Sequence, residues 1–282
     1  MASEFRLTLI YRRQCLGGWV ERYTHFSSVL DCQMQFSLYL PPALALDAVP
    51  VLYWLSDIEE SDEDFLRHSG VAFFAAQLGI AIVCCDTSPR GSTIPNLASQ
   101  HVGLGTSFYV DATEPPWRAH FQMYSYVSIE LPGVIEFNFH VNGLRSIAGL
   151  GMGGFGALVV GLTRPDSYLS ISAFAPFCRP TKSDKLREAL RQYLGPEGAK
   201  WRRYDTKELI QNSKCWLPTL IDVGFANGET ERVQDIESLA VAANKSNFPL
   251  TLNLRLNYDN GYFFVLSFIE SHLQFHGNYL LD

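Results

Sequence analysis

The sequence predicts an α/β protein with a mostly parallel, doubly wound sheet and helices on both faces. Apolar runs of strand length alternate with longer segments of helical period along the 282 residues. Several of the short runs are almost wholly apolar, which is typical of strands that helices cover on both faces. No linker rich in Pro, Gly or Ser interrupts this alternation. A single domain spanning residues 1–282 is therefore expected.

The first half of the chain contains three expected strands, at residues 35–42, 49–55 and 80–86. Residues 61–79 predict a helix, because a Ser or Asp cap and an acidic first turn precede apolar residues at helical spacing. That helix should end at Gly79. Residues 87–121 have little periodicity and many Gly, Ser and Pro, so they predict a long loop of the kind that often lies over a functional site.

The second half predicts a helix over residues 123–139, with a kink or restart near Leu131 because a proline follows it. A strand at 145–149 and a helix at 153–165 come next. The remaining expected strands are 168–176, 217–224 and 249–256, and the remaining helices are 182–195, 231–245 and 262–280. Because a helix follows each of these strands, right-handed crossovers and parallel pairing are expected.

Composition argues against several classes of partner. The 22 Lys and Arg are outnumbered by 29 Asp and Glu, which gives a formal net charge of −7, and no basic run is present. Nucleic acid is therefore not an expected partner, and neither is an anionic membrane surface. The longest uncharged stretch, residues 146–163, is rich in glycine and predicts a buried core segment. No membrane insertion is expected.

The cysteines and acidic residues predict no metal site. The six cysteines have neither metal-ligand spacing nor the density of a disulfide scaffold, and the N-terminal residues lack the apolar run of a signal peptide. A cytoplasmic protein with reduced thiols is the expectation. The acidic stretch at 56–65 lacks the alternating oxygen ligands of a calcium loop. It predicts a solvated helix start.

One motif has the spacing of a hydrolase catalytic site. The stretch "SIAGLGMGGFGALVV" (146–160) contains the frame Gly149-Leu150-Gly151-Met152-Gly153 between an expected strand and an expected helix. Gly-x-Ser-x-Gly at such a junction is the nucleophile elbow of hydrolases, where the outer glycines allow a sharp turn and close packing. The outer glycines are present here, but the central residue is Gly151. Any glycine-rich turn can match this frame, so the motif alone identifies no function.

Further blocks of sequence carry a more specific resemblance. They include "GGWVERYTHFS" (17–27), "MQFSLYLPP" (34–42), "PVLYWLS" (50–56), "CDTSPRG" (85–91), "FYVDATEPPW" (108–117), "MYSYVSIELP" (123–132), "GMGGFGAL" (151–158), "SAFAPFCRP" (172–180), "LIDVG" (220–224) and "YDNGYFFVLSFIESH" (258–272). In this order they resemble the S-formylglutathione hydrolase (esterase D) family of α/β-hydrolases, from about Gly17 to the C-terminus. The resemblance implies the α/β-hydrolase fold.

The resemblance also implies which residues should do the chemistry. Members hydrolyse the thioester of S-formylglutathione in formaldehyde detoxification, and many cleave small esters, with a Ser-His-Asp triad and no cofactor or metal. Transferred to this chain, the nucleophile falls at Gly151, the acid at Asn227 and the base at Asn260. All three roles are therefore expected to be vacant. The oxyanion-hole amides fall at Ile58 and Met152.

Three carboxylates, Asp57, Glu59 and Glu60, are expected where an oxyanion would form, and their negative charge opposes that charge. The sequence thus predicts a non-catalytic homologue that acts as a binding, regulatory or structural subunit. The alternative is a residual thioesterase or carboxylesterase that uses an unrecognised group or direct attack by water. A homodimer and a heteromer with an active paralogue or a larger assembly both remain open as partners. The sequence identifies no small-molecule ligand.

Overall fold

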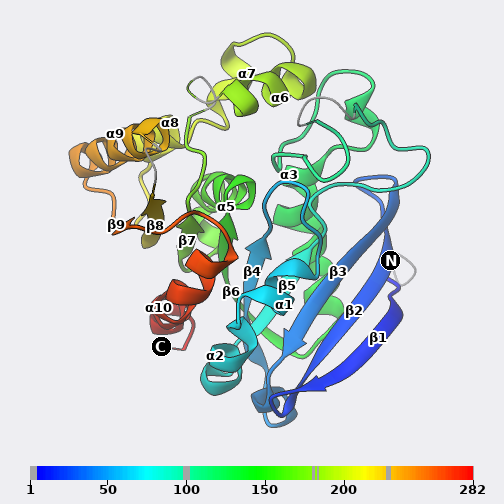
Figure 1. Cartoon of the computed structure of the whole chain (residues 1–282). Helices are drawn as coiled ribbons and strands as arrows, with labels where there is room; N and C mark the ends of the chain where they lie inside the picture. Colours follow the sequence, from blue (N-terminus) through cyan, green and yellow to red (C-terminus); the bar gives the residue numbers. More distant parts are fainter. Residues whose placement is uncertain (1–4, 98–101, 180–181, 183, 227–229, 282) are drawn as a thin grey trace.

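The computed structural model describes residues 5–97, 102–179, 182, 184–226 and 230–281. Its centre is a nine-stranded sheet in the order β1-β2-β3-β5-β4-β6-β7-β8-β9. The strands are β1 (Thr8–Cys15), β2 (Gly18–Ser27), β3 (Cys32–Leu40), β4 (Val49–Leu55), β5 (Ala81–Cys85), β6 (Val141–Leu150), β7 (Ile171–Phe174), β8 (Thr219–Phe225) and β9 (Leu250–Leu256). The pairs from β5 to β9 are parallel, and β1, β2 and β3 are antiparallel to their neighbours. Figure 1 shows β1, β2 and β3 together at one side of the sheet.

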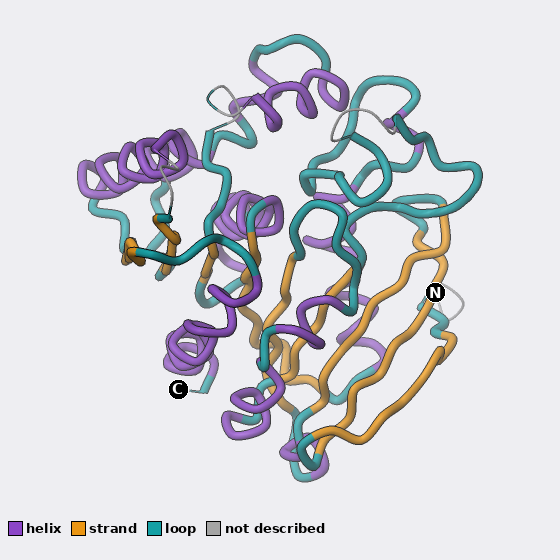
Figure 2. The backbone as a smooth tube through the Cα atoms, viewed as in Figure 1, coloured by secondary structure: helices purple, strands orange, loops and turns teal. Residues whose placement is uncertain are grey.

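Helices cover both faces of the sheet, as Figure 2 shows by colour. The α-helices are α1 (Asp64–His68), α2 (Val71–Leu78), α3 (Met123–Ser125), α4 (Leu131–Asn138), α5 (Met152–Thr163), α6 (Asp184–Leu194), α7 (Ala199–Arg202), α8 (Thr206–Asn212), α9 (Thr230–Ser246) and α10 (Tyr262–Leu280). Successive side chains of β4 enter opposite cores: Tyr53 packs in the core that includes α4 and α5, and Trp54 in the core that includes α2 and α10. A strand buried on both faces needs a continuous apolar sequence. The predicted α/β single-domain class with a mostly parallel sheet is confirmed.

The first two strands are absent from the sequence-based expectations. None of the residues of β1 is buried, so this edge strand lacks the apolar alternation that identifies a half-buried strand. A tight turn at Leu16 and Gly17, both with positive φ, joins it to β2. The hairpin extends the sheet beyond β3 with antiparallel strands.

The predicted helix at 61–79 is two helices. Gly70 adopts a left-handed conformation with φ of 69° and ends the first helix before α2 begins. The expected restart near Leu131 is confirmed, because a π-helical turn (Tyr126–Glu130) separates α3 from α4. The short helices α7 and α8 lie in a region where no helix was predicted. None of the helices in the described ranges has the length and apolar character that crossing a bilayer requires.

Candidate functional site

The junction between β6 and α5 has the backbone of a sharp strand-to-helix turn. Gly151, the residue between them, has φ of 53° and ψ of −109°, a conformation that residues with side chains rarely adopt. Its amide donates to the carbonyl of Phe174 at 2.9 Å, and its carbonyl accepts from the amide of Phe155 at 3.0 Å. The turn is therefore held by β7 on one side and by the first turn of α5 on the other.

The outer glycines of the motif allow close backbone packing. A Cβ atom added to Gly153 would lie well under 3.0 Å from the carbonyl oxygen of Leu55, at the end of β4. A Cβ atom at Gly149 would meet the same oxygen and the backbone of Gly153. The start of α5 thus packs directly on the neighbouring strand, which explains why the sequence has glycine at both positions.

The carboxylate of Asp57 occupies the space beside Gly151. A Cβ atom added to Gly151 would lie well under 3.0 Å from Cγ and from both carboxylate oxygens of Asp57. The amide of Met152 donates to Oδ1 of Asp57 at 2.7 Å. A negative charge is stabilised here because the first amides of a helix carry a partial positive charge. Asp57 therefore fills the position into which a side chain at residue 151 would project.

Glu60 holds the segment that contains Asp57. Its Oε2 accepts from the backbone amide of Asp57 at 2.9 Å and from the hydroxyl of Tyr262 at 3.0 Å. Tyr262 is the first residue of α10. Burial of the carboxyl group, together with the nearby charge of Asp57, raises the pKa of Glu60 to about 7, although the hydrogen bond from the Asp57 amide opposes this rise. Glu60 thus links the loop after β4 to the start of α10.

Replacing Glu60 with glutamine is expected to change how stability depends on pH. The pKa of Glu60 rises from 4.5 to about 7 on folding, so the folded state binds the proton more tightly, and the free energy of unfolding falls as the pH rises between these values. Glu60→Gln removes this dependence and keeps an oxygen acceptor for both hydrogen bonds. The free energy of unfolding of the variant minus that of the unmodified protein should therefore be larger at pH 8 than at pH 4.5. The increase should be up to about 3 kcal/mol. Urea denaturation at the two pH values measures this difference. An identical effect of the substitution at both would contradict the prediction.

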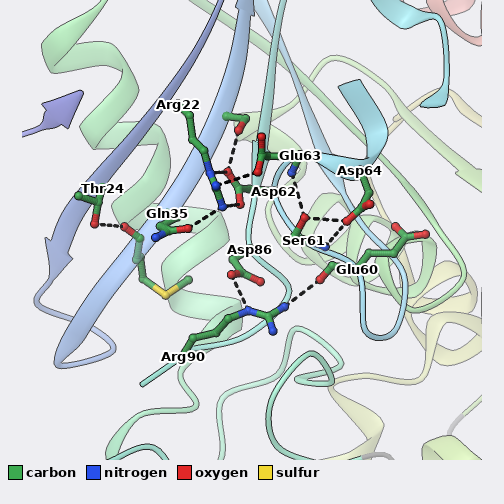
Figure 3. Close-up of polar contacts among 12 residues, drawn as sticks. Arg22, Thr24, Gln35, Glu60, Ser61, Asp62, Glu63, Asp64, Asp86 and Arg90 are labelled. Atoms are coloured by element: carbon green, nitrogen blue, oxygen red, sulfur yellow. Dashed lines mark hydrogen bonds and ion pairs between the residues drawn. The ribbon is translucent and has the colours of Figure 1, made fainter. Parts of the chain in front are cut away.

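A buried ion pair anchors the acidic segment to the antiparallel strands, as Figure 3 shows. The guanidinium of Arg22 on β2 contacts both carboxylate oxygens of Asp62 at 2.8 Å, and its Nη1 lies 2.7 Å from Glu63. Asp62 is fully buried and also accepts from the hydroxyl of Ser37 at 2.7 Å. The prediction of a solvated helix start is therefore wrong for Asp62, which is buried and paired with a partner far away in the sequence, whereas Glu59 in the same stretch is exposed.

The predicted long loop packs against the same segment. Nη2 of Arg90 and the hydroxyl of Thr87 both donate to the carbonyl of Glu60, at 3.0 and 2.7 Å, and Arg90 also pairs with Asp86 (Figure 3). The amide of Glu59 donates to the carbonyl of Gly105 at 2.9 Å. The loop after β5 thus helps to fix the loop after β4.

The other expected site residues lie at the same edge of the sheet where the structure describes them. The carboxamide of Asn260, in the loop between β9 and α10, accepts from the amide of Gly224 at 2.9 Å and donates to its carbonyl at 3.3 Å. It is therefore bound to the backbone of β8. Ile58 is half-buried and packs against the core that includes α5. Asn227 lies outside the described residues.

The structure brings together residues that the sequence did not connect. Contacts run from Gly151 to Asp57, then to Glu60 and to Tyr262, two residues after Asn260. Asp57 and Glu60 were expected near the oxyanion position. The contact of Asp57 with the site of a side chain on Gly151, and the hydrogen bond from Tyr262 to Glu60, were not expected. Among the described residues, no group of three or more His, Cys, Asp or Glu side chains could hold a metal ion.

The chain as a whole matches known esterases in sequence and in structure. The model of the Esterase family matches residues 27–275. An S-formylglutathione hydrolase from Agrobacterium tumefaciens superimposes with a TM-score of 0.93 at 36% identity, covering 97% of this chain and 99% of its own. The fluorophosphonate-binding serine hydrolase FphF of Staphylococcus aureus superimposes with a TM-score of 0.73 at 16% identity, covering 93% of this chain and 99% of its own. The S-formylglutathione hydrolase FrmB of the same organism superimposes with a TM-score of 0.68 at 15% identity, covering 97% of this chain and 100% of its own.

The last two similarities show the fold alone, because their sequence identities are low. The match over residues 27–275 and the 36% identity over 97% of the chain show the family as well. The chain belongs to the esterase family and has the α/β-hydrolase fold of its S-formylglutathione hydrolase-like members.

Proposed function

We propose that this chain is a non-catalytic member of the esterase family that acts as a binding, regulatory or structural subunit. Glycine at the elbow is the observation that carries the proposal. Covalent acyl transfer needs an atom that attacks the carbonyl carbon, a base that takes its proton and a group that orients the base. Gly151 has no side chain that could attack, although its backbone makes the sharp strand-to-helix turn at which hydrolases carry a nucleophile.

The surrounding side chains support the same proposal. Asn260 stands at the position that the family resemblance assigns to the base, and a carboxamide cannot accept and release a proton near neutral pH. Its hydrogen bonds to Gly224 give it a role in holding the loop to β8. The carboxylate of Asp57 already accepts from the amide of Met152. A negative charge there opposes the negative charge that develops on a carbonyl oxygen during acyl transfer.

The experiment compares turnover by the unmodified protein with turnover by a restored variant. The variant carries Gly151→Ser, Asn227→Asp and Asn260→His together with Asp57→Gly, which clears the space beside residue 151. The substrates are S-formylglutathione and 4-nitrophenyl acetate. For the unmodified protein we expect at most the ~10³–10⁴-fold acceleration over water that binding alone leaves in enzymes without a triad. A kcat/KM in the enzymatic range of about 10⁴–10⁸ M⁻¹s⁻¹ for the unmodified protein would overturn the proposal.

As the biological setting of this function, we propose a cytoplasmic protein that forms a homodimer or assembles with an active paralogue or a larger complex. Native mass spectrometry after purification from the natural source measures the mass of the assembly. A mass that exceeds one copy of this chain supports the proposal, and a monomer contradicts it.

A further inference from the structure

We propose that Asp57 is a built-in block of the elbow, so that Asp57 and a side chain at residue 151 exclude each other. This inference rests on the proposed function, since it explains how the elbow is kept without a nucleophile. Its basis is the position of the carboxylate: all three of its heavy atoms lie too close to the site of a Cβ atom on Gly151. Real Cβ atoms essentially never approach other atoms to less than 3.0 Å.

The carboxylate blocks the site in two ways. It takes the space of a side chain at residue 151, and it takes the hydrogen bond of the Met152 amide, which it accepts at 2.7 Å. Met152 is the first residue of α5, so its amide has no acceptor within the helix. A substrate oxygen that approached this amide would therefore have to displace Asp57.

The carboxylate is held by the amide of Met152, and the backbone that carries it is fixed. The Asp57 amide donates to Glu60, and the Glu60 amide donates back to the Asp57 carbonyl at 3.2 Å. Glu60 is held in turn by Tyr262, Thr87 and Arg90. A side chain at residue 151 would therefore have to turn the carboxylate away from the Met152 amide, and the two positions should respond to substitution as a pair.

A double-mutant cycle tests this coupling without any requirement for activity. Gly151→Ala is measured by urea denaturation in three backgrounds: unmodified, Asp57→Gly and Asp57→Asn. We expect the alanine to raise the unfolding equilibrium constant about 100-fold or more in the unmodified background, and at least tenfold less in Asp57→Gly, where the strain of positive φ remains but the clash is gone. Asp57→Asn keeps the bulk, so its penalty should equal that of the unmodified background. Equal penalties in the Asp57→Gly and unmodified backgrounds would overturn the proposal.

Hydrogen exchange supplies a second readout if Gly151→Ala does not fold. In Asp57→Gly alone, the amide of Met152 loses its acceptor, and we expect its exchange rate to rise at least tenfold relative to the unmodified protein, with the amide of Phe155 as an internal reference. An unchanged rate at Met152 would overturn the proposal. Either result is independent of turnover, so failure of this inference is distinguishable from failure of the proposed function.

Discussion

Replacing Asp222 with alanine is expected to lower the free energy of unfolding by about 3 kcal/mol. Asp222 is fully buried on β8 and accepts from Nε of Arg255 at 2.8 Å and from Nδ2 of Asn253 at 2.7 Å, both on β9. Nε2 of the buried His272 on α10 lies 3.7 Å from Oδ1 of Asp222. Alanine would leave Arg255 and Asn253 without their shared acceptor and would remove the carboxylate beside the buried ring of His272.

Urea denaturation at pH 7 measures the loss, with Asp222→Asn as the control. Asparagine keeps an oxygen acceptor and the volume of the side chain, so its loss should be smaller than that of alanine. A loss below about 1 kcal/mol for Asp222→Ala, the range of exposed ion pairs, would contradict the prediction.

Replacing Gly153 with alanine is expected to cost about 3 kcal/mol or more, because the added methyl group would collide with the carbonyl oxygen of Leu55. Leu55 lies on β4, which pairs with β5 and β6, so its backbone cannot move away without breaking sheet hydrogen bonds.

Gly133→Ala is the matched control for this substitution. Gly133 also lies in a helix, α4, but the nearest atom to an added Cβ would be the ring of Phe5 at an ordinary 3.6 Å. Since alanine favours helix over glycine by about 1 kcal/mol, the control should be neutral or stabilising. Thermal unfolding of both variants measures the contrast, and equal melting temperatures would contradict the packing argument.

The parts of the fold that could be predicted are those where burial dictates the residue type. The nearly continuous apolar residues of β4 and β5 indicate strands covered on both faces, and the structure buries every one of them. The hairpin of β1 and β2 could not be predicted in this way, because the edge strand β1 buries no residue. Gly70 could have marked the break between α1 and α2, since glycine is favoured at positive φ.

The contact between Asp57 and Gly151 depends on sheet topology, which the sequence does not display directly. β4 pairs with β6 in parallel, with Leu55 opposite Gly149. Two residues beyond each of these partners lie Asp57 and Gly151, so the pairing register alone brings them to the same edge. The anchoring of Asp62 by Arg22 likewise requires β2 to be placed beside β3, and β2 was not predicted.

The most direct test of the central claim is the mass of the intact protein after incubation with an excess of a fluorophosphonate, with the restored variant as positive control. The account predicts no stoichiometric adduct on the unmodified protein and one adduct at residue 151 of the variant that carries Gly151→Ser. A single stoichiometric adduct on the unmodified protein, mapped by peptide sequencing to a residue at the carboxyl edge of the sheet, would contradict the account.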